Sequence, residues 1–128
     1  MFDRPIVGIG QLVAAAVIAW AGVTKLLATP GNVFIFQELG MEPFGRHLVG
    51  VIEIGAGLLL LTRGFAALGA LLTVGIMFGA IIAHVTFLGV DVQGDGGTHT
   101  LLLVAVLLSA GFVLFSRRRD LPLIGETL

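Results

Sequence analysis

The stretch GFAALGALLTVGIMFGAIIAHVTFLGV, from Gly64 to Val90, decides the fold, and His84 is its one ionisable residue. A helix needs about 17–25 predominantly apolar residues to cross the roughly 30 Å of hydrocarbon in a bilayer, and this stretch is long enough. Three other apolar runs in the chain have a similar character. The four spans expected from these runs are about 6–27, 47–62, 64–90 and 98–116.

The overall composition indicates a membrane protein. Hydrophobic residues make up 57% of the 128 residues, 19 more are glycines, and charged residues amount to 12%, about half of their usual share. A soluble fold of this size could not bury so much apolar surface. Runs such as Leu101–Leu108 lack the alternation of a transmembrane β-strand. We therefore predict an all-α integral membrane four-helix bundle, a single domain over residues 1–128.

The same numbers exclude several classes of protein. The net charge is −1, which leaves no basic face for nucleic acid, and the apolar content is too high for a disordered chain. The chain contains no cysteine, which excludes disulfides, thiolate nucleophiles, iron–sulfur clusters and cysteine-based zinc sites.

Arginines are distributed unevenly over the two ends of the expected spans. Arg4, Arg63 and the run Arg117–Arg119 fall on one side, and Arg46, expected to anchor among lipid headgroups, falls on the other. Because cationic residues concentrate in cytoplasmic loops, this asymmetry predicts a multi-pass protein with both termini in the cytoplasm. The alternative, a signal peptide cleaved near Ala19-Trp20-Ala21, requires a shorter apolar segment than this one.

The segments between the expected spans differ in character. Residues 31–45 mix apolar and acidic side chains, and we expect them to lie along the outer interface as a short amphipathic helix or to plug the mouth of the bundle. The turn at Arg63-Gly64 is so short that the second and third spans must be antiparallel neighbours. Residues 90–97, rich in glycine and aspartate, are typical of an exposed loop.

Ionisable residues inside the spans are the informative ones, because each costs about 2.5–3.5 kcal/mol or more at the centre of a membrane helix. Lys25, Glu53 and His84 come from three different spans, and His99 begins the fourth. In the expected orientation all of them fall in the outer half of the membrane. We therefore predict a shared, outward-facing polar pocket. Its candidate residues are Lys25, Glu53, His84, His99, Gln11 and Trp20.

Each candidate also has a purely structural interpretation. Lys25 can extend to the outer headgroups, and Glu53 can form an ion pair with Lys25 that only joins two helices. His84 and Gln11 can serve as hydrogen-bonding residues between helices, and His99 can be an interfacial residue. These alternatives stay open at the level of sequence.

Small residues surround the candidate positions. Gly50 and Gly57 lie on the same helical face as Glu53, and Gly75-x-x-x-Gly79 precedes His84. Such faces allow two helices to approach closely. The pattern predicts tight packing, and it serves a bundle within one chain or a homo-oligomer equally well.

The chemistry of the cluster suits a quinone. Lysine and histidine side chains can bind the two carbonyl oxygens of a quinone head, with the Glu53 carboxylate as proton partner. A metal site would need oxygen and nitrogen ligands such as His84, His99 and Glu53, but their spacing does not favour one, and we predict no metal. Axial haem ligation by His84 and His99 is a further, less favoured alternative. The cofactor therefore stays unknown.

Three segments resemble a known family. AGVTKLL at 21–27, ELGMEP at 38–43 and GVIEIGAGLLL at 50–60, with Ala83-His84 later in the chain, resemble the DoxX family of small bacterial membrane proteins. The resemblance covers nearly the whole chain. It implies a four-helix bundle in the bacterial cytoplasmic (inner) membrane and, for some members, association with quinone-linked oxidation of sulfur compounds, as in thiosulfate:quinone oxidoreductase subunits.

The resemblance also assigns residues. Lys25 and Glu53 match the family's intramembrane charged pair, and His84 matches its polar position on the third helix. One departure matters, because family members often carry an arginine near the position of Gln11. Without that cation, a thiosulfate or other anion site inferred from those relatives is in doubt. The lack of cysteine also argues against the thiol chemistry of similar quinone reductases.

These observations favour a membrane subunit or accessory protein of a quinone-linked redox system, with Lys25, Glu53 and His84 lining its pocket. Whether the chain is itself an enzyme stays open, since electrons would have to come through a bound cofactor or a partner redox subunit. Two other hypotheses remain. One is a module that binds or transports a small lipophilic solute or a proton, and the other is a structural membrane scaffold.

Overall fold

The computed structural model describes residues 5–62, 64–89, 97–122 and 125–127, and within these ranges all regular structure is helical. The elements are α1 (Pro5–Leu26), α2 (Pro30–Glu38), α3 (Phe44–Leu60), α4 (Ala66–Ala83), the π-helical turn η1 (His84–Leu88), α5 (Thr98–Ser116), and two short 3-10 turns, η2 (Arg118–Asp120) and η3 (Gly125–Thr127). Most of the loop expected at 90–97 lies outside the described residues.

Helix boundaries follow local signals in the sequence. Helix α2 begins at Pro30, where proline is well tolerated because the first helical N–H has no partner within the helix. Helix α1 ends just before Ala28, which has a positive φ of 57°, and the chain then turns into α2. The expected outer segment 31–45 therefore contains one short helix followed by a turn into α3.

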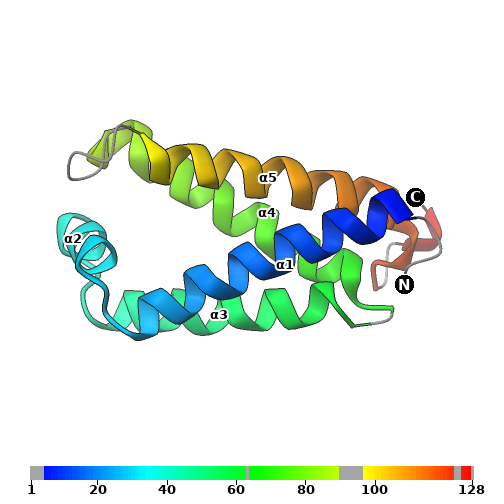
Figure 1. Ribbon diagram of the computed structural model, residues 1–128, viewed down its shortest axis with the longest axis horizontal. Coiled ribbons are helices and arrows are strands. Elements are labelled where there is room, and N and C mark those ends of the chain that lie inside the picture. The colour runs from blue at the N-terminus through cyan, green and yellow to red at the C-terminus, as the bar shows by residue number, and fades with distance from the viewer. Residues whose placement is uncertain (1–4, 63, 90–96, 123–124, 128) are drawn as a thin grey trace.

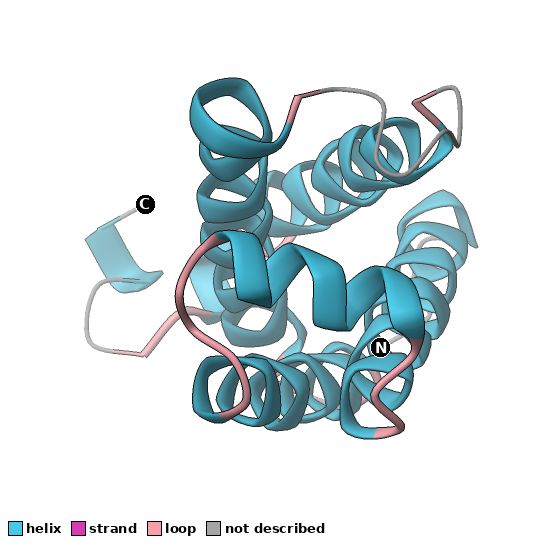
Figure 2. Cartoon of the chain, turned by 90° about the vertical axis from the view of Figure 1, so that its left-hand side faces the viewer, coloured by secondary structure: helices cyan, strands magenta, loops and turns pink. Residues whose placement is uncertain are grey.

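The four long helices are arranged side by side. Helix α1 packs against α3 and α5, and α4 packs against α3 and α5. Figure 1 shows that α4 and α5 lie apart from α1 and α3 at the end where α2 lies, while α1 begins and α5 ends at the opposite end. In Figure 2, α2 runs across the end of the other helices. Helix α2 thus lies across the end at which α4 and α5 are apart from α1 and α3.

Glycines allow the backbones of α1 and α3 to touch. A Cβ atom on Gly22 would lie 2.6 Å from the carbonyl oxygen of Gly50, and one on Gly50 would lie 3.0 Å from the carbonyl oxygen of Gly22. Gly69 makes the same kind of approach between α4 and α3, 2.6 Å from the Leu60 nitrogen. The close-packed face around Glu53 therefore lies within one chain. Gly75 and Gly79 behave differently, since a Cβ on either would meet nothing within 4 Å.

The outer surface of the helices carries many large apolar side chains. The buried core is built mainly of alanine and branched aliphatic residues, with one methionine, from all four long helices, namely Ala14, Ala15, Ile18, Leu60, Ala70, Met77, Val106, Ala110 and Val113. Large apolar side chains such as Phe44, Val85 and Leu101 remain exposed. Within the described part of the chain, two helical stretches, Pro5–Leu26 and Ala66–Thr86, are long and apolar enough to cross a membrane. Exposed apolar surface on this scale is typical of contact with lipid or with other chains.

The glycine contacts give a direct test of the fold. We expect Gly22→Ala to lower the free energy of unfolding by about 1–3 kcal/mol, because the added methyl group forces the backbones of α1 and α3 apart. Gly55→Ala, on the same pair of helices but with nothing within 4 Å of its Cβ position, should be neutral or stabilising by up to about 1 kcal/mol. Thermal unfolding followed by circular dichroism in detergent checks both. Equal effects of the two substitutions would contradict the observed contact between α1 and α3.

Candidate functional site

The space beneath α2 contains two adjoining cavities of about 450 and 460 Å³. The first opens between α1 and α5, and we call it the α1–α5 cavity. The second opens between α3 and α4, and we call it the α3–α4 cavity. They share six lining residues, Lys25, Asn32, Ile35, Glu53, Met77 and Leu103. The two cavities therefore adjoin at Lys25 and Glu53, and we call them together the chamber.

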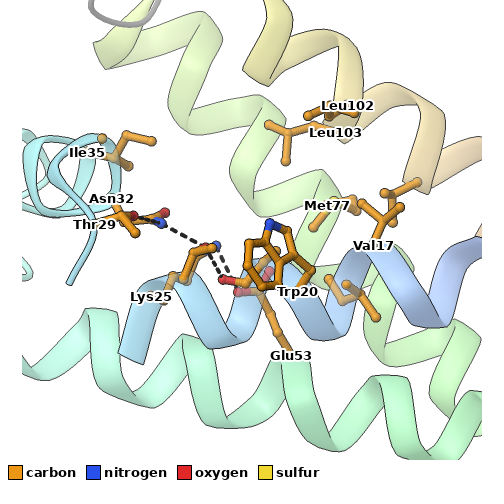
Figure 3. A pocket seen from close by; sticks show the side chains of 15 residues that line it. Val17, Trp20, Lys25, Thr29, Asn32, Ile35, Glu53, Met77, Leu102 and Leu103 are labelled. Carbon is orange, nitrogen blue, oxygen red and sulfur yellow. Dashed lines mark hydrogen bonds and ion pairs between the residues drawn. The ribbon is translucent and has the colours of Figure 1, made fainter. Parts of the chain in front are cut away.

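An ion pair between α1 and α3 lies at the centre of the chamber. Lys25 Nζ is 2.8 Å from Glu53 Oε1, and the side chains are 12% and 1% exposed. Figure 3 shows the two side chains pointing toward each other below α2. Gly50, one turn before Glu53, lets α1 come so close that its Cβ position is 3.2 Å from the Cβ of Lys25. The charged pair therefore depends on the glycine contact between the helices.

Arg46 fixes the end of α1 that carries Lys25. Its Nε donates hydrogen bonds to both carboxylate oxygens of Glu42, at 2.9 and 2.8 Å, and its Nη1 donates to the backbone carbonyl of Lys25. The residue is buried, so the expectation that Arg46 anchors among headgroups is wrong. The Lys25 carbonyl, near the end of α1, also accepts from the Ala28 N–H at 3.2 Å, so the guanidinium is a second donor to it. The i,i+4 spacing of Glu42 and Arg46 was the available signal.

Asn32 is a lining residue that the sequence reasoning missed. Its Nδ2 donates to Thr24 Oγ1 at 3.0 Å and to Thr29 Oγ1 at 2.7 Å, and the residue is buried. These bonds join the start of α2 to the end of α1, as Figure 3 shows for Asn32 and Thr29. The polar sequence Thr29-Pro30-Gly31-Asn32 signalled a helix boundary, but it carried no sign that Asn32 turns inward.

His84 lines the α3–α4 cavity together with Lys25 and Glu53. It is buried, and its Nδ1 lies 2.7 Å from the carbonyl oxygen of Ala80. A carbonyl only accepts, so Nδ1 carries the proton. The residue stands where α4 passes into the π-helical turn η1, and such turns are frequent at functional sites.

Gln11 lies apart from the other candidates and lines neither cavity. It is fully buried, its Nε2 donates to the Leu60 carbonyl oxygen at 2.8 Å, and its Oε1 accepts from Arg117 Nε at 2.8 Å. Gln11 and Lys25 share a helical face, but about 21 Å of helix separates them along the axis. Gln11 thus joins α1 to α3 and to the end of α5, in agreement with its structural interpretation.

The structure places Trp20 at a cavity, but it does not describe the side chain of His99. Trp20 lines the α1–α5 cavity, although 66% of the residue is exposed, and Figure 3 labels it among the residues around that cavity. His99 falls in the first turn of α5, but its side chain lies outside the described part of the structure. Among the residues that the structure describes, no group of three histidine, aspartate or glutamate side chains is placed to hold a metal ion.

Comparison of the chain with known protein families, with curated proteins and with solved structures finds no match. The resemblance to the DoxX family therefore stays an expectation from the sequence. The chamber, its ion pair and the helices that hold them are the basis on which a function can be proposed.

A double-mutant cycle tests how much the interaction between Lys25 and Glu53 contributes to the free energy of unfolding. We expect Lys25→Met to cost about 3–5 kcal/mol of stability, because it leaves the Glu53 charge buried without compensation. Glu53→Gln should cost less, since the partly exposed Lys25 ammonium can still reach solvent. The double variant, which buries no charge, should be more stable than Lys25→Met. Equilibrium unfolding in mixed micelles measures all three, and additive losses would show that the two side chains do not interact.

Proposed function

We propose that the chain is an integral membrane protein in which α1, α3, α4 and α5 form a four-helix bundle, with both termini on the cytoplasmic side of a bacterial inner membrane. The apolar helices and their exposed apolar side chains support insertion in lipid. The arginine asymmetry supports the orientation. In this arrangement α2 and the chamber lie toward the outer face of the membrane.

Within that bundle the chamber binds a small lipophilic molecule with a polar head, and a quinone is the class that fits best. The observation that carries this proposal is the buried Lys25–Glu53 pair, at 2.8 Å, in the wall of a largely apolar space. Cavities of about 300–1,000 Å³ with apolar walls and a few polar groups are the usual form of small-molecule sites. Each of the two cavities is of this size.

The side chains have distinct parts in this proposal. The Lys25 ammonium donates to a carbonyl oxygen of the head, and Glu53 holds that ammonium in place. His84, whose Nδ1 lies 2.7 Å from the Ala80 carbonyl oxygen, lines the α3–α4 side of the chamber. Asn32 and Arg46 position the end of α1. Electron transfer to or from the bound molecule belongs to a partner redox subunit or a bound cofactor.

A structural scaffold is the second candidate, and the ion pair itself favours it. A lysine and a glutamate that contact each other at 2.8 Å join α1 to α3 whether or not any ligand binds. The two functions differ in one measurable respect. A scaffold needs the pair only for stability, whereas a binding site needs Lys25 to contact the ligand.

Orientation can be tested with single cysteines, because the chain has none. We expect Gln37→Cys, on an exposed position of α2, to react with a membrane-impermeant maleimide in intact cells. Thr127→Cys, exposed near the other end, should react only after lysis. Labelling is read by gel shift, with the lysed sample as control for reactivity. Labelling of Thr127→Cys, but not of Gln37→Cys, in intact cells would reverse the proposed orientation.

Ligand binding can be followed through Trp20, the only tryptophan in the chain. We expect a decyl-substituted benzoquinone to quench its fluorescence saturably in detergent. Lys25→Met/Glu53→Gln, which avoids an unpaired buried charge, should weaken the affinity about tenfold or more, as expected for losing one hydrogen bond to a charged group.

The control for non-specific quenching moves the reporter to the opposite end of the molecule. In Trp20→Phe/Phe115→Trp the new tryptophan replaces a residue that is 68% exposed, close to the 66% of Trp20. Quenching of this tryptophan should be weak and should rise linearly with the quinone concentration. Equal quenching of both reporters, or an affinity unchanged by the double substitution at Lys25 and Glu53, would favour the scaffold.

A further inference from the structure

Helices α3 and α4 are close at one end and open at the other. Near the turn that connects them, a Cβ on Gly69 of α4 would lie 2.6 Å from the Leu60 nitrogen and 2.8 Å from the Ala56 carbonyl oxygen. Further along α4, Gly75 and Gly79 have nothing within 4 Å of their Cβ positions. Figure 1 shows that the two helices diverge toward the end where α2 lies.

The opening between them belongs to the chamber. Gly75 and Gly79 line the same α3–α4 cavity as Lys25 and Glu53. Both glycines are exposed, so this cavity reaches the outer surface of the helices. The ion pair and the two exposed glycines thus border one continuous cavity.

The walls of this path are apolar. The opening is bordered by Val49 and Ile52 on α3 and by Ile76 and Ile82 on α4. Its hydroxyl group, on Thr86, donates to the Ile82 carbonyl oxygen at 2.7 Å, and His84 Nδ1 donates to Ala80. Both donors bond to a backbone carbonyl four residues earlier in the chain, so a hydrocarbon chain in the opening would leave neither donor unsatisfied. The α1–α5 cavity differs, because the hydroxyl residues Thr24 and Thr29 line it and do not line the α3–α4 cavity.

We propose that the α3–α4 opening holds the hydrocarbon tail of the ligand, and that Gly75 and Gly79 determine the preference for a long-chain amphiphile. This inference rests on the proposed function. The polar head lies at Lys25 and Glu53, and the tail leaves sideways over the two glycines. The glycines contribute to selectivity by the absence of a side chain, since any larger residue at these positions would fill the path.

The test compares two probes, the decyl-substituted benzoquinone and the benzoquinone with the same head and no tail, both measured by Trp20 quenching. Gly79→Leu should weaken binding of the decyl probe at least tenfold and change binding of the tail-less probe less than twofold. Gly75→Leu provides a second variant if Gly79→Leu does not fold. Gly111→Leu, on α5 and with nothing within 4 Å of its Cβ position, is the matched control and should change neither affinity.

The outcomes separate the two proposals. If the unaltered protein binds neither probe, the proposed function fails, and the inference fails with it. If both probes bind but Gly79→Leu leaves the decyl affinity unchanged, or weakens both probes equally, the tail does not follow this path and only the inference is overturned. A change of oligomeric state in Gly79→Leu, with both affinities retained, would instead assign the opening to contact with a second copy of the chain.

Discussion

The contact between Lys25 and Glu53 is the interaction on which the rest of the chamber depends. A carboxylate that is 1% exposed is tolerated only with a compensating charge close by, because removing an isolated ion from water costs several kcal/mol. That requirement brings the end of α1 onto the middle of α3. Arg46 then binds the last turn of α1 through the Lys25 carbonyl, and Asn32 ties α2 to it. One buried charge thus explains why these segments meet.

Glycine has two opposite uses in this fold. At Gly22 and Gly50 the missing side chain lets two backbones touch, which brings the charged residues within reach of each other. At Gly75 and Gly79 the missing side chain leaves open space. Glycine therefore allows close packing between α1 and α3, and on α4 it leaves space unfilled. The difference comes from the neighbouring helix and not from the glycines themselves.

The sequence predicted part of the site for physical reasons that are local. An ionisable residue in an apolar helix demands a partner, so Lys25 and Glu53 were identifiable one by one, and a pair between them was an obvious option. The position of Gln11 was misleading, because a shared helical face says nothing about distance along the axis. Arg46 and Asn32 were missed as site residues, since both lie at helix ends, where polar residues are common and are expected to face solvent.

The sequence alone determined that the chain is helical and apolar, and roughly where its long helices begin and end, because the length and continuity of apolar runs are properties of the chain itself. It also determined which residues carry charge within those runs. Only the tertiary structure decided that Gln11 contacts Arg117 at 2.8 Å, that α2 crosses the end of the other helices, and that α4 diverges from α3. Those features depend on how tightly each helix pair packs along its length, and that is set by contacts between residues far apart in the sequence.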